Sequence, residues 1–139
     1  MAWRLLMQTQ VPVGWNAMAP KHVLVVDDDP SILDLLSRAL ATAELRVSTA
    51  RRVSLARDVL ARQKIDLIIT DARIPGETGL RLTDTARELG IAYILISGDP
   101  EWASAHGIAP DQYLAKPFDL RELSQLVRAH LDAEAKERL

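Results

Sequence analysis

The sequence predicts an α/β domain with a doubly wound, five-stranded parallel sheet and helices on both of its faces. From Lys21 onward, short apolar runs rich in β-branched residues alternate with segments of helical periodicity, an alternation typical of βαβ units. Three of these runs are apolar almost throughout, as expected for central strands covered on both faces. The second alternates with polar residues and the fifth is short, so both belong at the edges. These observations predict the strand order 2-1-3-4-5.

The predicted elements follow from apolar spacing and from capping residues. We expect strands at residues 23–27, 45–49, 65–71, 91–97 and 112–115, helices near 30–42, 53–63, 79–89 and 100–106, and a last helix from about 119 to 134. Asp29 before Pro30 is a helix start signal, and Asp119 can cap the last helix. Apolar stripes place Leu55 and Leu120 on buried helix faces.

Composition limits the classes of function. The chain has 139 residues, 48% of them hydrophobic and 26% charged, and a net charge of -2. This balance gives no electrostatic reason to expect nucleic-acid or membrane binding. The absence of cysteine excludes disulfide frameworks and thiol nucleophiles, and it fits a cytoplasmic protein.

Residues 1–20 are predicted to form an N-terminal extension that precedes the domain at 21–139. Polar residues at 8–10 interrupt its apolar cluster, so a signal peptide is not expected, and no stretch elsewhere has membrane-spanning length. The favoured interpretation is a flexible tail, or an upstream start with Met18 as the natural one. The alternative is a docking arm that uses Trp3 and Trp15.

Ionisable and polar residues gather where the predicted strands end. The first strand ends at Asp27 and Asp28, the third at Asp71 and the fourth at Ser97, while Lys116 follows the fifth. Because ligands of open α/β sheets bind at the carboxyl ends of the strands, we expect these side chains to converge. Neighbouring carboxylates repel one another, and a hard divalent cation such as Mg²⁺ relieves that repulsion.

Such a set of groups is suited to phosphoryl transfer. Positioning and charge neutralisation supply nearly all of the catalysis in that reaction. Asp71 is the predicted nucleophile, since an aspartate can take a phosphoryl group as a labile acyl phosphate. An Asp-x-Asp at Asp27 and Asp29 leaves open a phosphohydrolase of the haloacid dehalogenase type, although that alternative gives Asp71 no role.

Four ordered motifs resemble those of the response-regulator receiver family, which is typified by the chemotaxis receivers of bacteria. They are VLVVDDDPSI, IITDARIPGETGL, ILISG and YLAKPF, and the resemblance extends from about Lys21 to the end of the last helix. It implies a flavodoxin-like receiver fold. It also implies that Asp28 binds Mg²⁺ directly, that Asp27 assists largely through water, and that the backbone carbonyl of Arg73 is a further ligand.

The resemblance also implies the remaining roles. Asp71 would accept the phosphoryl group from a sensor histidine kinase or a phosphotransfer protein, and Lys116 would pair with the phosphoryl oxygens. The Ser97 hydroxyl would then move towards the phosphoryl group and Tyr113 would follow inward as the switch. The Lys116–Pro117 peptide bond is expected to be cis. A separate output protein would read the change, and the chain would be a monomer or a weak homodimer.

Some of these residues have plainer interpretations. Ser97 by itself could be a strand-end residue whose hydroxyl forms a hydrogen bond with a loop amide. Arg73 could reach the phosphoryl group or simply face solvent. Gly98 leaves little steric cover over Asp71, which should favour access by a bulky phosphodonor.

The fourth helix is expected to end early, near His106. In the family this helix forms the usual output face together with the fifth strand and the last helix, so the early end puts the use of that face in doubt. A receiver-like interaction module that is not regulated by phosphorylation therefore remains an alternative.

Overall fold

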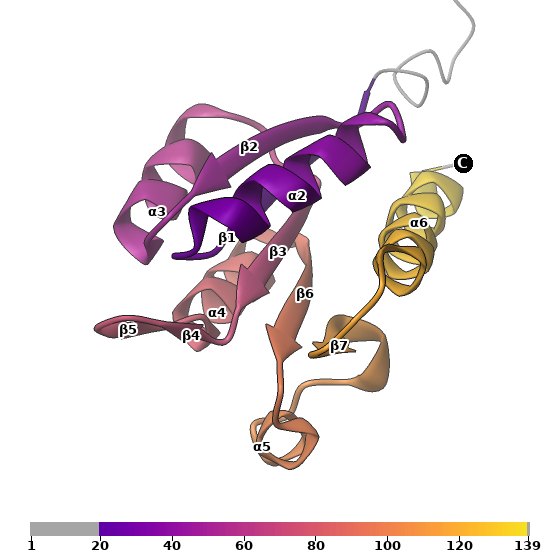
Figure 1. The fold of residues 1–139 in the computed structure, drawn as a ribbon. Helices are drawn as coiled ribbons and strands as arrows, with labels where there is room; N and C mark the ends of the chain where they lie inside the picture. Colours follow the sequence, from indigo (N-terminus) through magenta and orange to yellow (C-terminus); the bar gives the residue numbers. More distant parts are fainter. Residues whose placement is uncertain (1–19, 139) are drawn as a thin grey trace, which may run out of the picture.

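The chain folds around one five-stranded parallel sheet with helices on both faces (Figure 1). This computed structural model describes the backbone of residues 20–138 and the side chains as far as Asp132. The predictions for residues 1–19 lie outside the described residues. No helix in the described part of the chain has the length and apolar character needed to span a membrane.

The strands and helices follow the predicted alternation. The sheet strands are β1 (His22–Val26), β2 (Arg46–Ala50), β3 (Leu67–Asp71), β6 (Ala92–Ser97) and β7 (Tyr113–Ala115). The helices are α2 (Pro30–Ala41), α3 (Val53–Arg62), α4 (Leu80–Leu89), α5 (Pro100–Ala105) and α6 (Leu120–Arg138). The strand order is β2-β1-β3-β6-β7 with all neighbours parallel, which confirms the predicted order 2-1-3-4-5.

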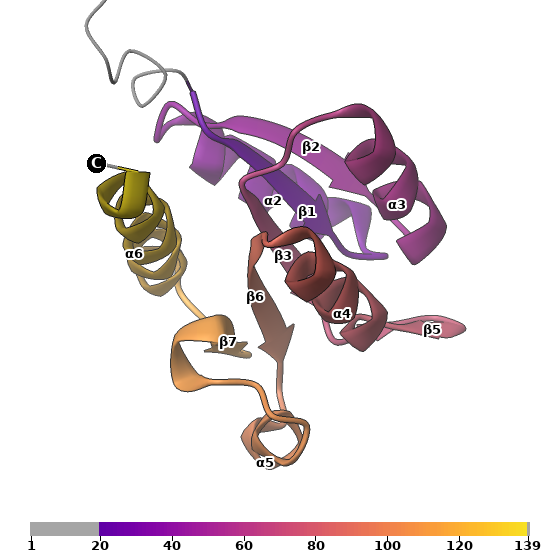
Figure 2. The same ribbon diagram turned by 180° about the vertical axis from the view of Figure 1, so that it is seen from behind.

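Two apolar layers hold the helices to the sheet. The helices α2 and α6 pack on one face through residues such as Leu36 and Leu123, while α3 and α4 pack on the other through residues such as Ala56 and Leu82. Figure 2, seen from behind, shows the side covered by α3 and α4. The strands β1, β3 and β6 are almost wholly buried, as predicted for central strands. Covered on both faces, they form the rigid base of the molecule.

The structure corrects several local predictions. The loop after β3 contains a small antiparallel hairpin, which is formed by β4 (Arg73–Ile74) and β5 (Glu77–Thr78). A strand of two residues is too short to show an apolar period in the sequence, so this hairpin was not predicted. A 3-10 turn, η2 (Pro110–Gln112), takes the start of the predicted fifth strand. The burial predicted for Leu55 and Leu120 is wrong, because these residues are 44% and 41% exposed.

Capping fixes where the helices begin. The Asp29 carboxylate accepts a hydrogen bond from the Ser31 N–H at 2.8 Å, and the Asp119 carboxylate accepts one from the Glu122 N–H at 2.7 Å. Both caps were predicted and are confirmed. The short α5 is confirmed as well, since it ends at Ala105 with Gly107 at a positive φ just beyond.

Candidate functional site

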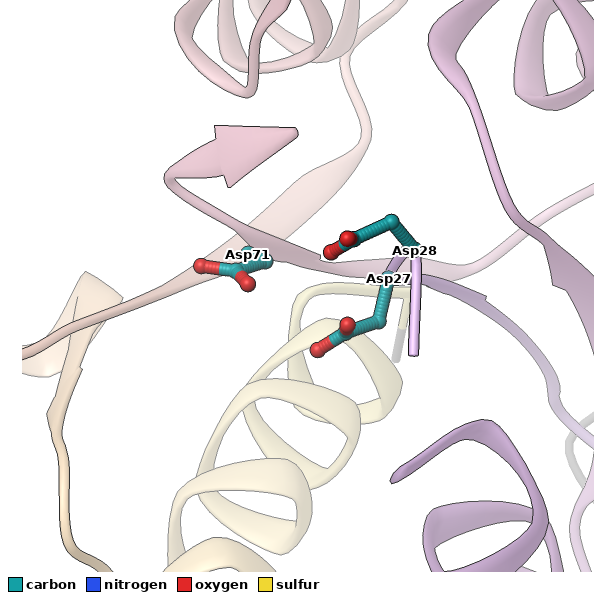
Figure 3. A group of neighbouring side chains, drawn as sticks. All are labelled: Asp27, Asp28 and Asp71. Atoms are coloured by element: carbon teal, nitrogen blue, oxygen red, sulfur yellow. The ribbon is translucent and has the colours of Figure 1, made fainter. Parts of the chain in front are cut away.

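Three carboxylates meet at the carboxyl end of the sheet. Asp27, Asp28 and Asp71 each offer one oxygen, and these oxygens lie within 4.8 Å of one another (Figure 3). Figure 3 shows the side chains of Asp27 and Asp28 extending towards Asp71. The parallel register brings them together, because β1 pairs with β3 from Val23 with Leu67 to Val26 with Thr70. The carboxyl ends of β1 and β3 are therefore aligned with each other.

Asp27 is a buried carboxylate in an unfavourable environment for its charge. It is 3% exposed, and one of its oxygens accepts a hydrogen bond from the Asp29 N–H at 2.9 Å. Burial raises the pKa of Asp27 to about 6, and repulsion from Asp71 adds to the effect, while the Asp29 N–H opposes it. A cation beside Asp27 would favour its ionised form.

Asp71 is held through both of its carboxylate oxygens. The residue is 8% exposed, Oδ1 accepts a hydrogen bond from the Arg73 N–H at 3.2 Å, and Oδ2 pairs with Lys116 Nζ at 3.1 Å. Lys116 reaches the site from the end of β7, just before a cis Lys116–Pro117 bond, which confirms that expectation. A charge-assisted bond of this kind is stronger than one between neutral groups.

Gly79 lies against the backbone of Asp71. A Cβ atom at residue 79 would overlap the carbonyl oxygen of Asp71, and the Gly79 N–H donates to the Ala72 carbonyl at 3.0 Å. The Thr70 hydroxyl donates to the same Asp71 carbonyl at 3.0 Å. The sequence indicated a tight loop here, but it could not reveal that crowding of the Asp71 backbone is what requires glycine.

Ser97 lies at the end of β6, and its hydroxyl oxygen is engaged by its own loop. The side chain is 6% exposed, and Oγ accepts a hydrogen bond from the Asp99 N–H at 3.0 Å. The Tyr113 hydroxyl donates to the Ser97 carbonyl at 2.7 Å. Burial, with the negative Asp99 nearby, raises the pKa of Tyr113. The structure thus links Ser97 to Tyr113 through the backbone.

A depression of about 370 Å³ opens next to Asp71. Its lining includes Ser97, Gly98, Lys116 and Arg73, so it brings together residues from three separate segments of the chain. A side chain at residue 98 would meet no other atom within 4 Å, which agrees with the expected lack of steric cover. The Arg73 side chain is exposed at the rim. Whether it contacts a phosphoryl group stays a prediction, as does the role of its carbonyl oxygen.

The acidic group suits a hard divalent cation. Three carboxylates supply only oxygen ligands, and repulsion from Asp71 and Asp28 adds to the burial that raises the pKa of Asp27. Mg²⁺ in proteins is usually bound by one or two carboxylates and keeps several waters. Asp29 is not a member of this group, because its carboxylate is exposed and caps α2.

Comparison with known proteins identifies relatives of one kind. The model of the response regulator receiver domain matches residues 23–128. The chain is 35% identical over 119 residues to the response regulator protein PilR of Pseudomonas aeruginosa, covering 82% of this chain and 27% of that protein. It is 32% identical to the transcriptional regulatory protein YvrH of Bacillus subtilis, covering 82% of this chain and 50% of that protein. The chain spans half or less of the length of these curated relatives.

Solved structures agree with the fold. A CheY-like receiver domain protein from Methanospirillum hungatei has 26% identity and a TM-score of 0.78, with 86% of this chain and 99% of that chain covered. The receiver domain of the TMAO respiratory system response regulator TorR has 30% identity and a TM-score of 0.72, with 81% of this chain and 97% of that chain covered; a protein of that name occurs in Escherichia coli. The similarity therefore covers nearly the whole of those domains.

Proposed function

The chain belongs to the response-regulator receiver family, and from that membership we propose that it is a phosphoacceptor switch of a two-component or phosphorelay system, with Asp71 as the acceptor. The observation that carries the assignment is the placement of Asp71. It is a buried carboxylate paired with Lys116, next to two further carboxylates, and it borders an open depression.

The proposed chemistry uses the chain's own groups. A carboxylate oxygen of Asp71 attacks the phosphorus of a phosphohistidine, the phosphorus–nitrogen bond breaks, and the histidine ring leaves with the bonding electrons and takes a proton from solvent. The product is an acyl phosphate on Asp71. Lys116 Nζ, 3.1 Å from Oδ2, balances the negative charge that collects there. Attack by water on the same phosphorus later releases inorganic phosphate and restores the carboxylate.

We propose that Asp28, Asp71 and the Arg73 carbonyl hold Mg²⁺ and that Asp27 assists largely through water. When bound, Mg²⁺ supplies positive charge to the carboxylates and to the phosphoryl oxygens. Asp27 must be ionised to contribute, and its pKa of about 6 allows this at neutral pH. The Asp29 N–H, which donates to Asp27, orients that carboxylate.

The proposed switch depends on a change of partner by the Ser97 hydroxyl. Its oxygen accepts from the Asp99 N–H, so a movement of this oxygen towards the phosphoryl group would break that bond, while the hydroxyl proton is available for donation to a phosphoryl oxygen. Tyr113 is bonded to the carbonyl of the same residue and would respond to such a movement. A few charge-assisted hydrogen bonds are enough to shift a two-state equilibrium decisively.

The partners follow from this chemistry. The donor is a sensor histidine kinase or a phosphotransfer protein in the cytoplasm, and a separate protein reads the face near Tyr113. We propose neither direct nucleic-acid contact nor a membrane role, and we propose a monomer or a weak homodimer. In this view the chain catalyses its own phosphorylation and dephosphorylation but acts as a signalling protein.

Two alternatives make different predictions. In an interaction module that is not regulated by phosphorylation, the site would be intact but would never be phosphorylated. The pairing of Asp71 with Lys116 favours a site that is phosphorylated. In a phosphohydrolase, Asp27 would be the nucleophile and Asp29 the second acid. The engagement of Asp29 as the cap of α2 weighs against that role. Hydrolysis of p-nitrophenyl phosphate that is lost in Asp27→Asn but kept in Asp71→Asn would support the phosphohydrolase.

Phosphate-affinity gel electrophoresis tests the proposal. Wild type and Asp71→Asn are incubated with acetyl phosphate in Mg²⁺ or in excess chelator, and the lanes are repeated with a phosphohistidine donor. We expect a retarded band only for wild type with Mg²⁺. A band of equal strength in Asp71→Asn would refute Asp71 as the acceptor, and no band with either donor would favour the interaction module.

A further inference from the structure

An apolar groove lies between the two helices that cover one face of the sheet. It has a volume of about 480 Å³, and its lining comes from the C-terminal end of α2, the residues that follow it and the helix α6. Figure 1 shows where these two helices lie. Buried apolar side chains, among them Leu40, Leu123 and Val127, form its base. The groove includes the C-terminal end of α2, whereas Asp27 and Asp28 precede the start of that helix, and none of the groove residues belongs to the site described above.

The groove exposes apolar surface that the described residues leave uncovered. Leu120, at the start of α6, is 41% exposed, and Leu45, just before β2, is half-buried in the lining. Charged side chains such as Arg128 and Asp132 stand at the border. An apolar groove with a polar border is the usual form of a binding surface for an apolar segment.

The chain itself supplies an apolar segment at this place. Lys21 lines the groove, and residues 1–19 directly precede it and Pro20. That segment, MAWRLLMQTQVPVGWNAMA, has Arg4 as its one charged side chain and holds Trp3 and Trp15, two of the three tryptophans of the protein. Solvation of so many large apolar side chains is unfavourable, and their burial is favourable.

We propose that residues 1–19 bind in this groove of the same molecule, with the Trp15 indole as the anchor. Trp15 precedes Lys21 by so few residues that an extended chain of roughly 20 Å spans the intervening distance. A short tether also gives the segment an effective concentration of the order of millimolar, so weak intrinsic affinity suffices. The sequence alone favoured a free tail, and the groove supplies the surface that the docking alternative lacked. The inference does not depend on phosphorylation of the domain.

Fluorescence of the full chain tests the proposal. In a background of Trp3→Phe and Trp102→Phe, Trp15 is the only indole, and acrylamide quenching measures its exposure. We compare this protein with the additional variant Ala39→Glu, which places a carboxylate in the groove. The matched control is Ala61→Glu, because Ala61 lines a groove of similar size between α3 and α4 on the opposite face.

We expect Trp15 to be shielded in the parent and in Ala61→Glu, with a quenching constant several-fold below that of Ala39→Glu. Ser124→Glu, on the α6 wall of the groove, should expose Trp15 as Ala39→Glu does, so the result does not hinge on one variant. Equal, full exposure in all proteins would overturn the proposal. So would shielding that both groove variants leave unchanged, and so would shielding that disappears on dilution, which would indicate the groove of a second copy.

Discussion

The carboxylates and the proposed switch residues lie at the same edge of one sheet, but the structure holds them differently. The carboxylate side, which we define as Asp27, Asp28 and Asp71, follows β1 and β3, two buried central strands. The switch side, defined as Ser97, Tyr113 and Lys116, comes from β6 and the three-residue edge strand β7. The first side thus follows central strands only, whereas the second combines the end of the central strand β6 with the edge strand β7.

The difference indicates which part of the site is preformed. Asp71 already has a hydrogen-bond donor for each oxygen, whereas the Ser97 hydroxyl is bonded within its own loop and the Lys116 side chain is 40% exposed. Local opening is easiest where few apolar contacts hold an element. We therefore expect metal binding to need little movement and signalling to need movement of the switch side.

Removal of Lys116 should have the largest effect. Lys116→Met removes the counter-charge of Asp71, and we expect phosphorylation by acetyl phosphate to slow by about 100-fold or more, as for loss of one preorganised charge donor. Lys116→Arg, which keeps a positive charge, should lose less. Time courses on phosphate-affinity gels measure both rates. An unchanged rate in Lys116→Met would mean that Lys116 takes no part in the chemistry.

Gly79→Ala tests the rigidity of the carboxylate side. Because the added Cβ would overlap the Asp71 carbonyl oxygen, we expect a loss of about 1–3 kcal/mol in the free energy of unfolding. The control is Gly98→Ala on the switch side, where a Cβ meets open space and the change should stay within about 0.5 kcal/mol. Urea unfolding measures both. Equal effects would show that the backbone around Asp71 and Gly79 can shift to accommodate the added methyl group.

The stability of the metal-free protein should depend on pH through Asp27. Its pKa is raised to about 6 in the folded state, so the native protein binds more protons than the unfolded chain between the two pKa values. The free energy of unfolding therefore falls as pH rises through that window, and the loss is complete above it.

Asp27→Asn removes this penalty. We expect the variant to be more stable than wild type by about 1–2 kcal/mol at pH 7.5 in chelator, with the difference vanishing near pH 4. Urea unfolding at the two pH values measures it. Added Mg²⁺ should stabilise wild type more than the variant. A variant that is less stable at neutral pH would contradict the repulsive environment assigned to Asp27.

Tyr113→Phe should have the smallest effect. It removes the hydrogen bond from the hydroxyl to the Ser97 carbonyl, a loss of about 0.5–1.5 kcal/mol in the free energy of unfolding. Tyr93→Phe is a control, since the Tyr93 hydroxyl bonds Arg87 and Gln112 away from Ser97. Only Tyr113→Phe should alter the lifetime of the phosphorylated state. The same lifetime in both variants would leave Tyr113 without a switch role.

The same contrast explains what the sequence could predict. Apolar strands and capping aspartates are local signals, and they predicted the strand order and the convergence of Asp27, Asp28 and Asp71 at one edge. Contacts between distant segments leave no such signal. The bond from the Val53 N–H to the Glu77 carboxylate, 2.9 Å long, joins α3 to a hairpin that periodicity cannot detect.

The switch side was harder to predict for a related reason. The residue types at Ser97 and Tyr113 suggested roles only through resemblance, because a hydroxyl can bond many partners and its choice depends on the packed structure. The bonds from the Asp99 N–H to Ser97 and from Tyr113 to the Ser97 carbonyl emerge only from the fold. Crowding at Gly79 is likewise a property of the packing.

The most direct test of the central claim is to locate the phosphoryl group by chemistry. Borohydride reduces an aspartyl phosphate to homoserine, which a mass-spectrometric peptide map assigns to one residue. After phosphorylation with Mg²⁺, we predict homoserine at position 71 and at no other aspartate. Homoserine at position 27 or 28 instead, or none in protein that a phosphohistidine donor has treated, would contradict the assignment of Asp71 as the phosphoacceptor.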